Sequence, residues 1–202
     1  MFGETVKRRV YRLGKRAEFA AGTRRRIIEA TLELHDQQGI SRTTVRDVAG
    51  RAAVAPSTVL QHFPRMADLI GACGELSDQL APMPTEALLA GAAGMAERVE
   101  RMATAMFEWW QLLGPGFDHL RVDRRDIPQV DAWLAGIALR HRRFAAAALA
   151  GSGLDRVDLL VALTTADAWA ALRAGGANTR KGGTQVAQLI GTGPPTHTEA
   201  IH

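Results

Sequence analysis

Four polar side chains lie within six residues near the start of the chain: Ser57, Thr58, Gln61 and His62. Hydroxyl, amide and imidazole groups can contact both phosphates and base edges of DNA. Pro56 precedes them and suits the first turn of a helix, where its missing N–H has no helical partner. The spacing predicts a short helix that buries Val59 and Leu60 and presents the polar side chains to a major groove.

A second short helix is expected just before this one. Its apolar residues recur at the spacing of one helix face: Val45, Val48, Ala49 and Ala52. Thr44 precedes Asp47 by three residues, which is the spacing of a capping box at a helix start. Ala53 and Val54 leave room only for a tight turn between the two helices. The pattern is typical of a DNA-binding helix-turn-helix.

These residues resemble the DNA-binding domain of the tetracycline-repressor (TetR) family of bacterial transcription regulators. The residues that match in order and spacing are Ala49, Ala52, Val54, Thr58, His62, Phe63, Pro64 and Leu69. Upstream, residues 23–45 resemble the family's first helix, with its end at Gly39. The recognisable match covers about the first third of the chain.

The resemblance implies an all-α fold, with an N-terminal three-helix helix-turn-helix domain followed by a larger helical ligand-binding and dimerisation domain. It also implies a homodimer that binds a palindromic operator in double-stranded DNA and responds to a small-molecule effector, more often as a repressor. The single cysteine, Cys73, favours a reducing cytoplasm. We expect the DNA contacts to come from Thr44, Arg46, Ser57, Thr58, Gln61, His62, Arg65, Arg24 and Arg25. Gln61 is the best candidate for a base contact, because glutamine can pair bidentately with adenine.

The sequence departs from the family pattern at four positions. Ala53 stands where a glycine is usual, so a left-handed turn there costs on the order of 1 kcal/mol. Leu60 and Met66 replace a tyrosine and a lysine that contact phosphates, and Ala55 replaces a serine cap. Arg65 is expected to recover the phosphate contact that Met66 lacks.

Charge is distributed unevenly along the 202 residues. Residues 1–65 hold 13 Lys and Arg against 6 Asp and Glu, a net +7, whereas residues 66–202 hold 12 against 15, a net −3. A polyanion partner is therefore expected at the N-terminal third. The basic N-terminal arm, residues 1–20, either contacts DNA or is a solvated, partly disordered terminus. The expected domains are the arm, a DNA-binding domain at 21–69, a ligand-binding and dimerisation domain at 70–190, and a disordered tail at 191–202.

The later part of the chain is helical in pattern throughout. Helices are expected over residues 69–80, 85–113, 127–150, 154–174 and 184–190, with residues 118–131 as a solvated, charged surface. A wide apolar surface suggests a two-fold dimer interface: Leu159, Leu160, Leu163, Ala166, Ala170 and Leu172. An ordinary buried helix in a monomer is the alternative.

Aromatic and methionine residues suggest a site for an apolar or amphiphilic effector, with plain core packing as the alternative. The candidate residues are Met102, Met106, Trp109, Trp110, Leu113, Phe117, Trp133, Phe144 and Trp169. Trp109 and Trp110 are adjacent, and they are not expected to face inward together.

Other classes of protein find little support in the sequence. Cys73 is the only cysteine, which excludes an intrachain disulfide and favours a small buried residue. No apolar run is long enough for a membrane span, and no signal peptide is recognisable. His119 and Asp123 have the spacing of metal ligands but lack a third, so neither a metal nor a cofactor is expected. An enzyme, or a protein-binding adaptor that has lost DNA binding, remains as an alternative function.

Overall fold

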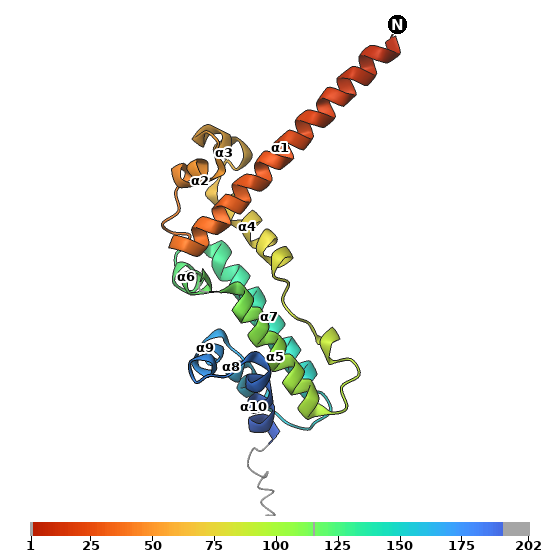
Figure 1. The fold of residues 1–202 in the computed structure, drawn as a ribbon, viewed down its shortest axis with the longest axis vertical. Helices are drawn as coiled ribbons and strands as arrows, with labels where there is room; N and C mark the ends of the chain where they lie inside the picture. The colour runs from red at the N-terminus through yellow and green to blue at the C-terminus, as the bar shows by residue number, and fades with distance from the viewer. Residues whose placement is uncertain (1, 115, 192–202) are drawn as a thin grey trace, which may run out of the picture. The chain divides into compact units, whose positions relative to one another are not determined.

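The structure is a computed structural model that describes residues 2–114 and 116–191, with side chains described from residue 15 onward. Every regular element in these ranges is helical, which confirms the predicted all-α fold. In chain order (Figure 1) the elements are α1 (Phe2–Gln38), α2 (Val45–Ala52), α3 (Pro56–His62), α4 (Met66–Leu80), η1 (Glu86–Leu89), α5 (Met95–Leu113), α6 (Gly116–Asp123), α7 (Pro128–Leu149), α8 (Val157–Leu163), α9 (Ala166–Ala174) and α10 (Thr179–Gly191). None of these helices is long and apolar enough to cross a membrane.

The helices form two compact units. The first contains residues 2–80 and 116–133, and the second contains residues 81–114 and 134–191. The first unit thus includes α6, although residues 70–190 were expected to form a separate ligand-binding and dimerisation domain. Of the predicted tail, residues 191–202, Gly191 is the last residue of α10, and residues 192–202 lie outside the described residues.

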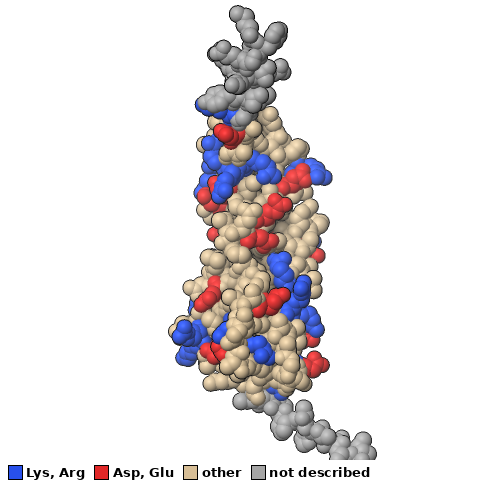
Figure 2. Space-filling model, turned by 90° about the vertical axis from the view of Figure 1, so that its right-hand side faces the viewer, with Lys and Arg blue, Asp and Glu red and all other residues tan. Residues whose placement is uncertain are grey.

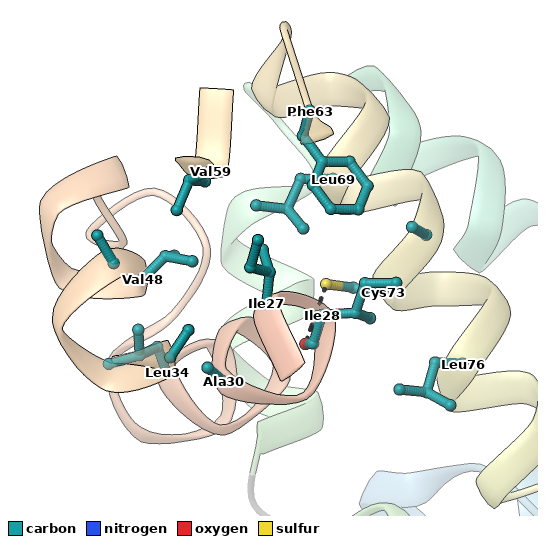
Figure 3. Close-up of a cluster of buried hydrophobic side chains, with 13 residues drawn as sticks. Ile27, Ile28, Ala30, Leu34, Val48, Val59, Phe63, Leu69, Cys73 and Leu76 are labelled. Atoms are coloured by element: carbon teal, nitrogen blue, oxygen red, sulfur yellow. Dashed lines mark hydrogen bonds between the residues drawn. The ribbon is translucent and has the colours of Figure 1, made fainter. Parts of the chain in front are cut away.

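The core of the first unit is made by α1 to α4 (Figure 3). Ile27 and Leu34 of α1, Val48 of α2 and Val59 of α3 meet in its centre. Cys73 of α4 is buried in the same core, and its thiol lies 3.8 Å from the Ile28 carbonyl oxygen. Burial raises the pKa of this thiol to about 12, so Cys73 acts as a small core residue, as predicted.

The α6 helix was not predicted, because its alternating charges suggested a solvated surface. Asp123 at its end is only 5% exposed, since its carboxylate accepts hydrogen bonds from the Ile40 backbone N–H at 2.7 Å and from the Ser41 hydroxyl. At the other end, a Cβ on Gly116 would lie 1.8 Å from an Asp36 carboxylate oxygen. The α6 helix is therefore seated closely on the C-terminal end of α1.

The second unit is organised around α5 and α10, which pack along each other. Gly182 and Gly183 make this possible, because a Cβ on Gly182 would meet the Phe107 ring at 2.9 Å and one on Gly183 would meet the Thr104 hydroxyl at 2.1 Å. Both glycines are buried inside α10. The prediction that the last helix starts at 184, after these glycines, was wrong for this reason. The α5 helix likewise starts at Met95 rather than 85.

The single helix expected over residues 154–174 is broken into α8 and α9 at Thr164 and Thr165. Thr164 is fully buried, and its hydroxyl donates to the Leu160 carbonyl at 2.7 Å and lies 2.8 Å from His141 Nε2. Its own carbonyl accepts from the Trp110 indole N–H at 2.8 Å. Thr165 then caps α9 by accepting from the Ala168 N–H. Hydrogen bonds from other helices, which periodicity does not reveal, hold the break.

Candidate nucleic-acid interface

The two short helices of the predicted helix-turn-helix are present, and local signals set both of their starts. Thr44 caps α2: its hydroxyl accepts from the Asp47 N–H at 3.2 Å, and the Asp47 carboxylate accepts from the Thr44 N–H at 2.9 Å. These bonds from Thr44 hold the pKa of Asp47 below its usual range. Pro56 occupies the first turn of α3, and Ala55 before it provides no side-chain cap. The predicted capping box and proline start are therefore confirmed.

The turn between α2 and α3 places Ala53 in the left-handed region, with φ 53° and ψ 48°. Among the residues that the structure describes, it is the only one other than glycine with a positive φ. The Ala53 and Val54 N–H groups close the end of α2 by donating to the Gly50 and Ala49 carbonyls at 3.3 and 3.0 Å. The strained left-handed conformation expected at Ala53 is present, and these hydrogen bonds maintain it.

The α3 helix buries one side chain fully and leaves most others accessible. Val59 is 0% exposed, as predicted, but Leu60 is 47% exposed. The prediction that Leu60 is buried was wrong, because adjacent residues of a helix point about 100° apart and the buried side of α3 is the one that holds Val59. Ser57 and Gln61 are exposed, and Thr58 and His62 are half-buried. Side chains of the predicted polar face thus reach solvent.

An open groove of about 600 Å³ runs between α1 and α3. Its first wall is a strip of α1 that contains Phe19, Ala20, Thr23 and Arg26. Its second wall is the α2–α3 turn with α3, and contains Ala53, Val54, Ala55, Thr58, Gln61 and His62. Three of the predicted DNA-contacting residues therefore share this groove. Phe19 of the α1 strip was missed in the sequence, because it is a single aromatic residue without a periodic neighbour.

The predicted arginine contacts are all exposed, and three of them already have partners. The Arg24 guanidinium lies 4.6 Å above the Phe63 ring. Arg25 pairs with Glu29 at 2.7 Å, and Arg65 pairs with Asp68 through two hydrogen bonds of 3.0 and 2.6 Å. Exposed pairs of this kind contribute little to stability, so phosphate contacts can compete with them.

Basic side chains cluster on the first unit. Exposed cations on α1 include Lys15, Arg16 and Arg24 to Arg26, and Arg46 is exposed on α2. Figure 2 shows Lys and Arg gathered on one face of this unit, with fewer Asp and Glu among them. The first unit therefore presents a surface that is attractive to a polyanion.

The predicted effector-site residues do not all lie in one unit. Phe117 and Trp133 belong to the first unit, where the Trp133 indole N–H donates to Asp78 at 3.2 Å. The others belong to the second, where Leu113 is half-buried and the rest are buried: Met102, Met106, Trp109, Trp110, Phe144 and Trp169.

The prediction that Trp109 and Trp110 do not both face inward was wrong. Trp109 is 3% and Trp110 is 8% exposed. Their indole N–H groups donate in different directions, to the carbonyls of Ala81 and Thr164, each at 2.8 Å. Other parts of the chain pack on two sides of α5, so both of these adjacent tryptophans are buried.

Among the described residues of the second unit, two buried polar groups lack a hydrogen-bond partner. They are the Trp169 indole N–H and the Gln185 side-chain oxygen. Trp169 stacks on Phe107 with ring centroids 5.1 Å apart, and Phe107 also packs against Gly182, one turn before Gln185. A free donor and a free acceptor thus lie on helices that pack around the same aromatic ring. No group of three or more potential metal ligands occurs within the described ranges.

A family model and two solved structures are similar to this chain. Residues 27–73 match the family model described as bacterial regulatory proteins, tetR family. Among solved structures, the multidrug binding protein EbrR complexed with imidazole is similar at 20% identity, covering 86% of this chain and 97% of that one, with a TM-score of 0.55. A TetR transcriptional regulator from Rhodococcus sp. RHA1 covers 85% of this chain and 95% of its own at 17% identity and a TM-score of 0.43. No curated protein matches the sequence.

The similarity to EbrR shows that the all-helical fold is shared along most of the chain. The family match is more specific, because it spans the segment that builds the helix-turn-helix core from Ile27 of α1 to Cys73 of α4. Over this segment, residues 27–73, the chain is similar to the bacterial regulatory proteins of the tetR family.

Proposed function

We propose that this regulator is a homodimeric repressor that binds a palindromic operator through α3 and leaves it when a small apolar or amphiphilic effector binds. The main support is the accessible polar face of α3 on a unit whose exposed surface is rich in arginine. The match of residues 27–73 to a model of bacterial regulatory proteins, rather than any missing catalytic feature, argues against the enzyme alternative. Because chromosomal DNA is the partner, we place the protein in the cytoplasm.

Individual DNA contacts are assigned from exposure and chemistry. Gln61 is exposed and contacts an adenine, while Ser57 and Thr58 contact phosphates or base edges beside it. His62 is half-buried and contacts the edge of the same site. The phosphates of the DNA backbone are contacted by four arginines: Arg24, Arg25, Arg46 and Arg65. Thr44 contributes from the start of α2, where its hydroxyl exchanges a 2.6 Å hydrogen bond to Asp47 for a phosphate.

A binding titration with the duplex upstream of the protein's own gene tests the DNA assignment. Gln61→Ala should weaken specific binding by about 1–3 kcal/mol and relax the preference at one base pair, whereas Arg65→Ala should weaken all sequences alike. Gln79→Ala is the matched control, because Gln79 is an exposed glutamine on α4 outside the interface. Equal affinity of the Gln61 and Gln79 variants for every duplex would contradict the assignment.

The same titration distinguishes the second candidate function, a protein-binding adaptor that has lost DNA binding. The exposed Leu60 on α3 favours this candidate, since it places an apolar side chain where a phosphate-contacting tyrosine is usual in the family. Absence of any preference for a duplex by the wild-type protein would support the adaptor and contradict the repressor.

The dimer is proposed to form through the second unit. Leu159 of α8 and Leu189 of α10 are 46% and 57% exposed on helices that contact each other, while Leu160 faces the core. Leu163, Ala166, Ala170 and Leu172 of the predicted surface are all at least partly exposed. Leu159→Glu with Leu189→Glu should yield a monomer in sedimentation, whereas Leu139→Glu, equally apolar and 61% exposed on α7, should not. A wild-type monomer at micromolar concentration would overturn this interface.

The effector is proposed to bind in the second unit beside Phe107 and Trp169. The unpaired Trp169 N–H and Gln185 oxygen give it one donor and one acceptor among aromatic and methionine side chains. EbrR is described as a multidrug binding protein, and we extend a preference for apolar or amphiphilic compounds to this chain. Such compounds should raise the melting temperature of the wild type and lose this effect in Trp169→Phe. An unchanged effect in Trp169→Phe would place the site elsewhere.

A further inference from the structure

We propose that the groove between α1 and α3 holds one sugar–phosphate strand of the operator, with Phe19 as an apolar contact and Arg26 as a phosphate contact. This inference rests on the proposed DNA-binding function and adds a second wall to it, made by residues that no family pattern or motif indicated. Recognition would then involve a strand held between two helices rather than one helix alone.

Phe19 is the most informative residue of the α1 wall. Its side chain is 75% exposed, although a phenylalanine gains about 1.5–3 kcal/mol when it is fully buried. It borders the same groove as Thr58, Gln61 and His62. A deoxyribose ring presents an apolar face between charged phosphates, so a strand in this groove would cover Phe19 without leaving a charge unpaired.

Arg26 supplies the matching charge on the same wall. Its side chain is exposed, and within the described residues it makes no ion pair, unlike Arg25 one position before it. Thr23 lies between Phe19 and Arg26 on this face of the helix. The wall thus places an apolar group and a cationic group on one helix face, which complements the apolar sugars and anionic phosphates of a nucleic-acid strand.

The composition of the groove favours a nucleic-acid strand over a protein segment or small ligand. None of its lining residues is acidic, and the basic helix α1 continues beyond it toward the N-terminus. The groove is open to solvent rather than enclosed, whereas small-molecule sites enclose most of their ligand. A polyanion that extends past the groove can use both the lining residues and the cations of α1.

Salt dependence separates the two proposed contacts. Wild type and variants are titrated with the operator duplex by fluorescence anisotropy between 50 and 300 mM salt. Phe19→Ala should lose roughly five- to tenfold in affinity with an unchanged salt slope, since no charge is removed. Arg26→Ala should lose affinity and reduce the slope by about one. Val122→Ala, at an apolar site 70% exposed on α6, is the control and should bind as wild type.

A second variant blocks the groove without removing a contact. Ala20→Trp places a large ring between the two walls and should reduce operator affinity at least tenfold, with the melting temperature as the check on folding. Wild-type affinity in either Phe19→Ala or Ala20→Trp would overturn the proposal, as would a changed oligomeric state of Phe19→Ala with unchanged DNA affinity, which would make a second copy the occupant. A wild-type protein that binds no operator contradicts the proposed function itself, which is a distinguishable result.

Discussion

Single residues decide how the helix-turn-helix is held. Ala53 adopts a left-handed conformation that glycine reaches at almost no cost, yet it packs no side chain that would offset the strain. The position is a local energetic weakness beside the proposed recognition helix. Its strain follows from the sequence, because the tight spacing between Ala52 and Pro56 leaves few other turn geometries.

Ala53→Gly should therefore stabilise the protein by about 0.5–1 kcal/mol, since relief of strain exceeds the added entropy of the unfolded chain. Equilibrium unfolding in urea measures the change. Ala52→Gly, one residue earlier and helical, should instead destabilise it. Destabilisation by both glycines would show that the turn is not strained.

At the scale of elements, local signals explain which helices could be predicted. The starts of α2 and α3 follow from Thr44, Asp47 and Pro56, which act within one helical turn. The break between α8 and α9 at Thr164 depends on His141 and Trp110, which are distant in sequence. The packing of α6 on α1 depends on Ile40, which is also distant in sequence from α6. The α1–α3 groove likewise depends on tertiary packing, so Phe19 gave no recognisable signal.

The close packing of α10 on α5 predicts a strong response at Gly183. A Cβ there would also lie 2.9 Å from the Glu100 carbonyl oxygen, which is backbone and cannot rotate away. Gly183→Ala should lower the free energy of unfolding by about 1–3 kcal/mol, the usual cost of overpacking. Gly191→Ala, at the end of α10 with open space around it, is the control. Equal stability of both variants would contradict the packing.

The α1 helix runs continuously from Phe2, so the backbone of the arm is the N-terminal half of the helix that also forms the core. Its first 20 residues span about 30 Å of helix. Removing residues 1–20 should weaken operator binding and flatten its salt dependence, because six Lys and Arg are lost. Replacing these six by Gln at constant length should have the same effect. An unchanged affinity and salt slope would leave the arm without a role in binding.

At the scale of the whole molecule, each compact unit contains one buried histidine, and burial disfavours the charged form of its ring. Burial lowers the pKa of His35 to about 4, against a smaller opposing effect of Asp123, and burial lowers the pKa of His141 to about 4. An unfolded histidine has a pKa of about 6.5. The unfolded chain therefore binds more protons between pH 6.5 and 4, and stability falls as the pH falls through this window.

The loss should be roughly 3 kcal/mol at most for each histidine, and should be nearly absent above pH 7. Urea unfolding at a series of pH values measures it, with His35→Gln and His141→Gln each expected to reduce the slope in this window. An unfolding free energy that stays constant between pH 7 and pH 5 would contradict the burial of both rings.

Titration of the wild-type protein against its own upstream duplex, with a scrambled duplex as competitor, tests the central claim most directly. We predict specific retardation with two protomers per palindrome, lost in Gln61→Ala and retained in Gln79→Ala. Equal affinity for the upstream and scrambled duplexes would contradict recognition of DNA through α3.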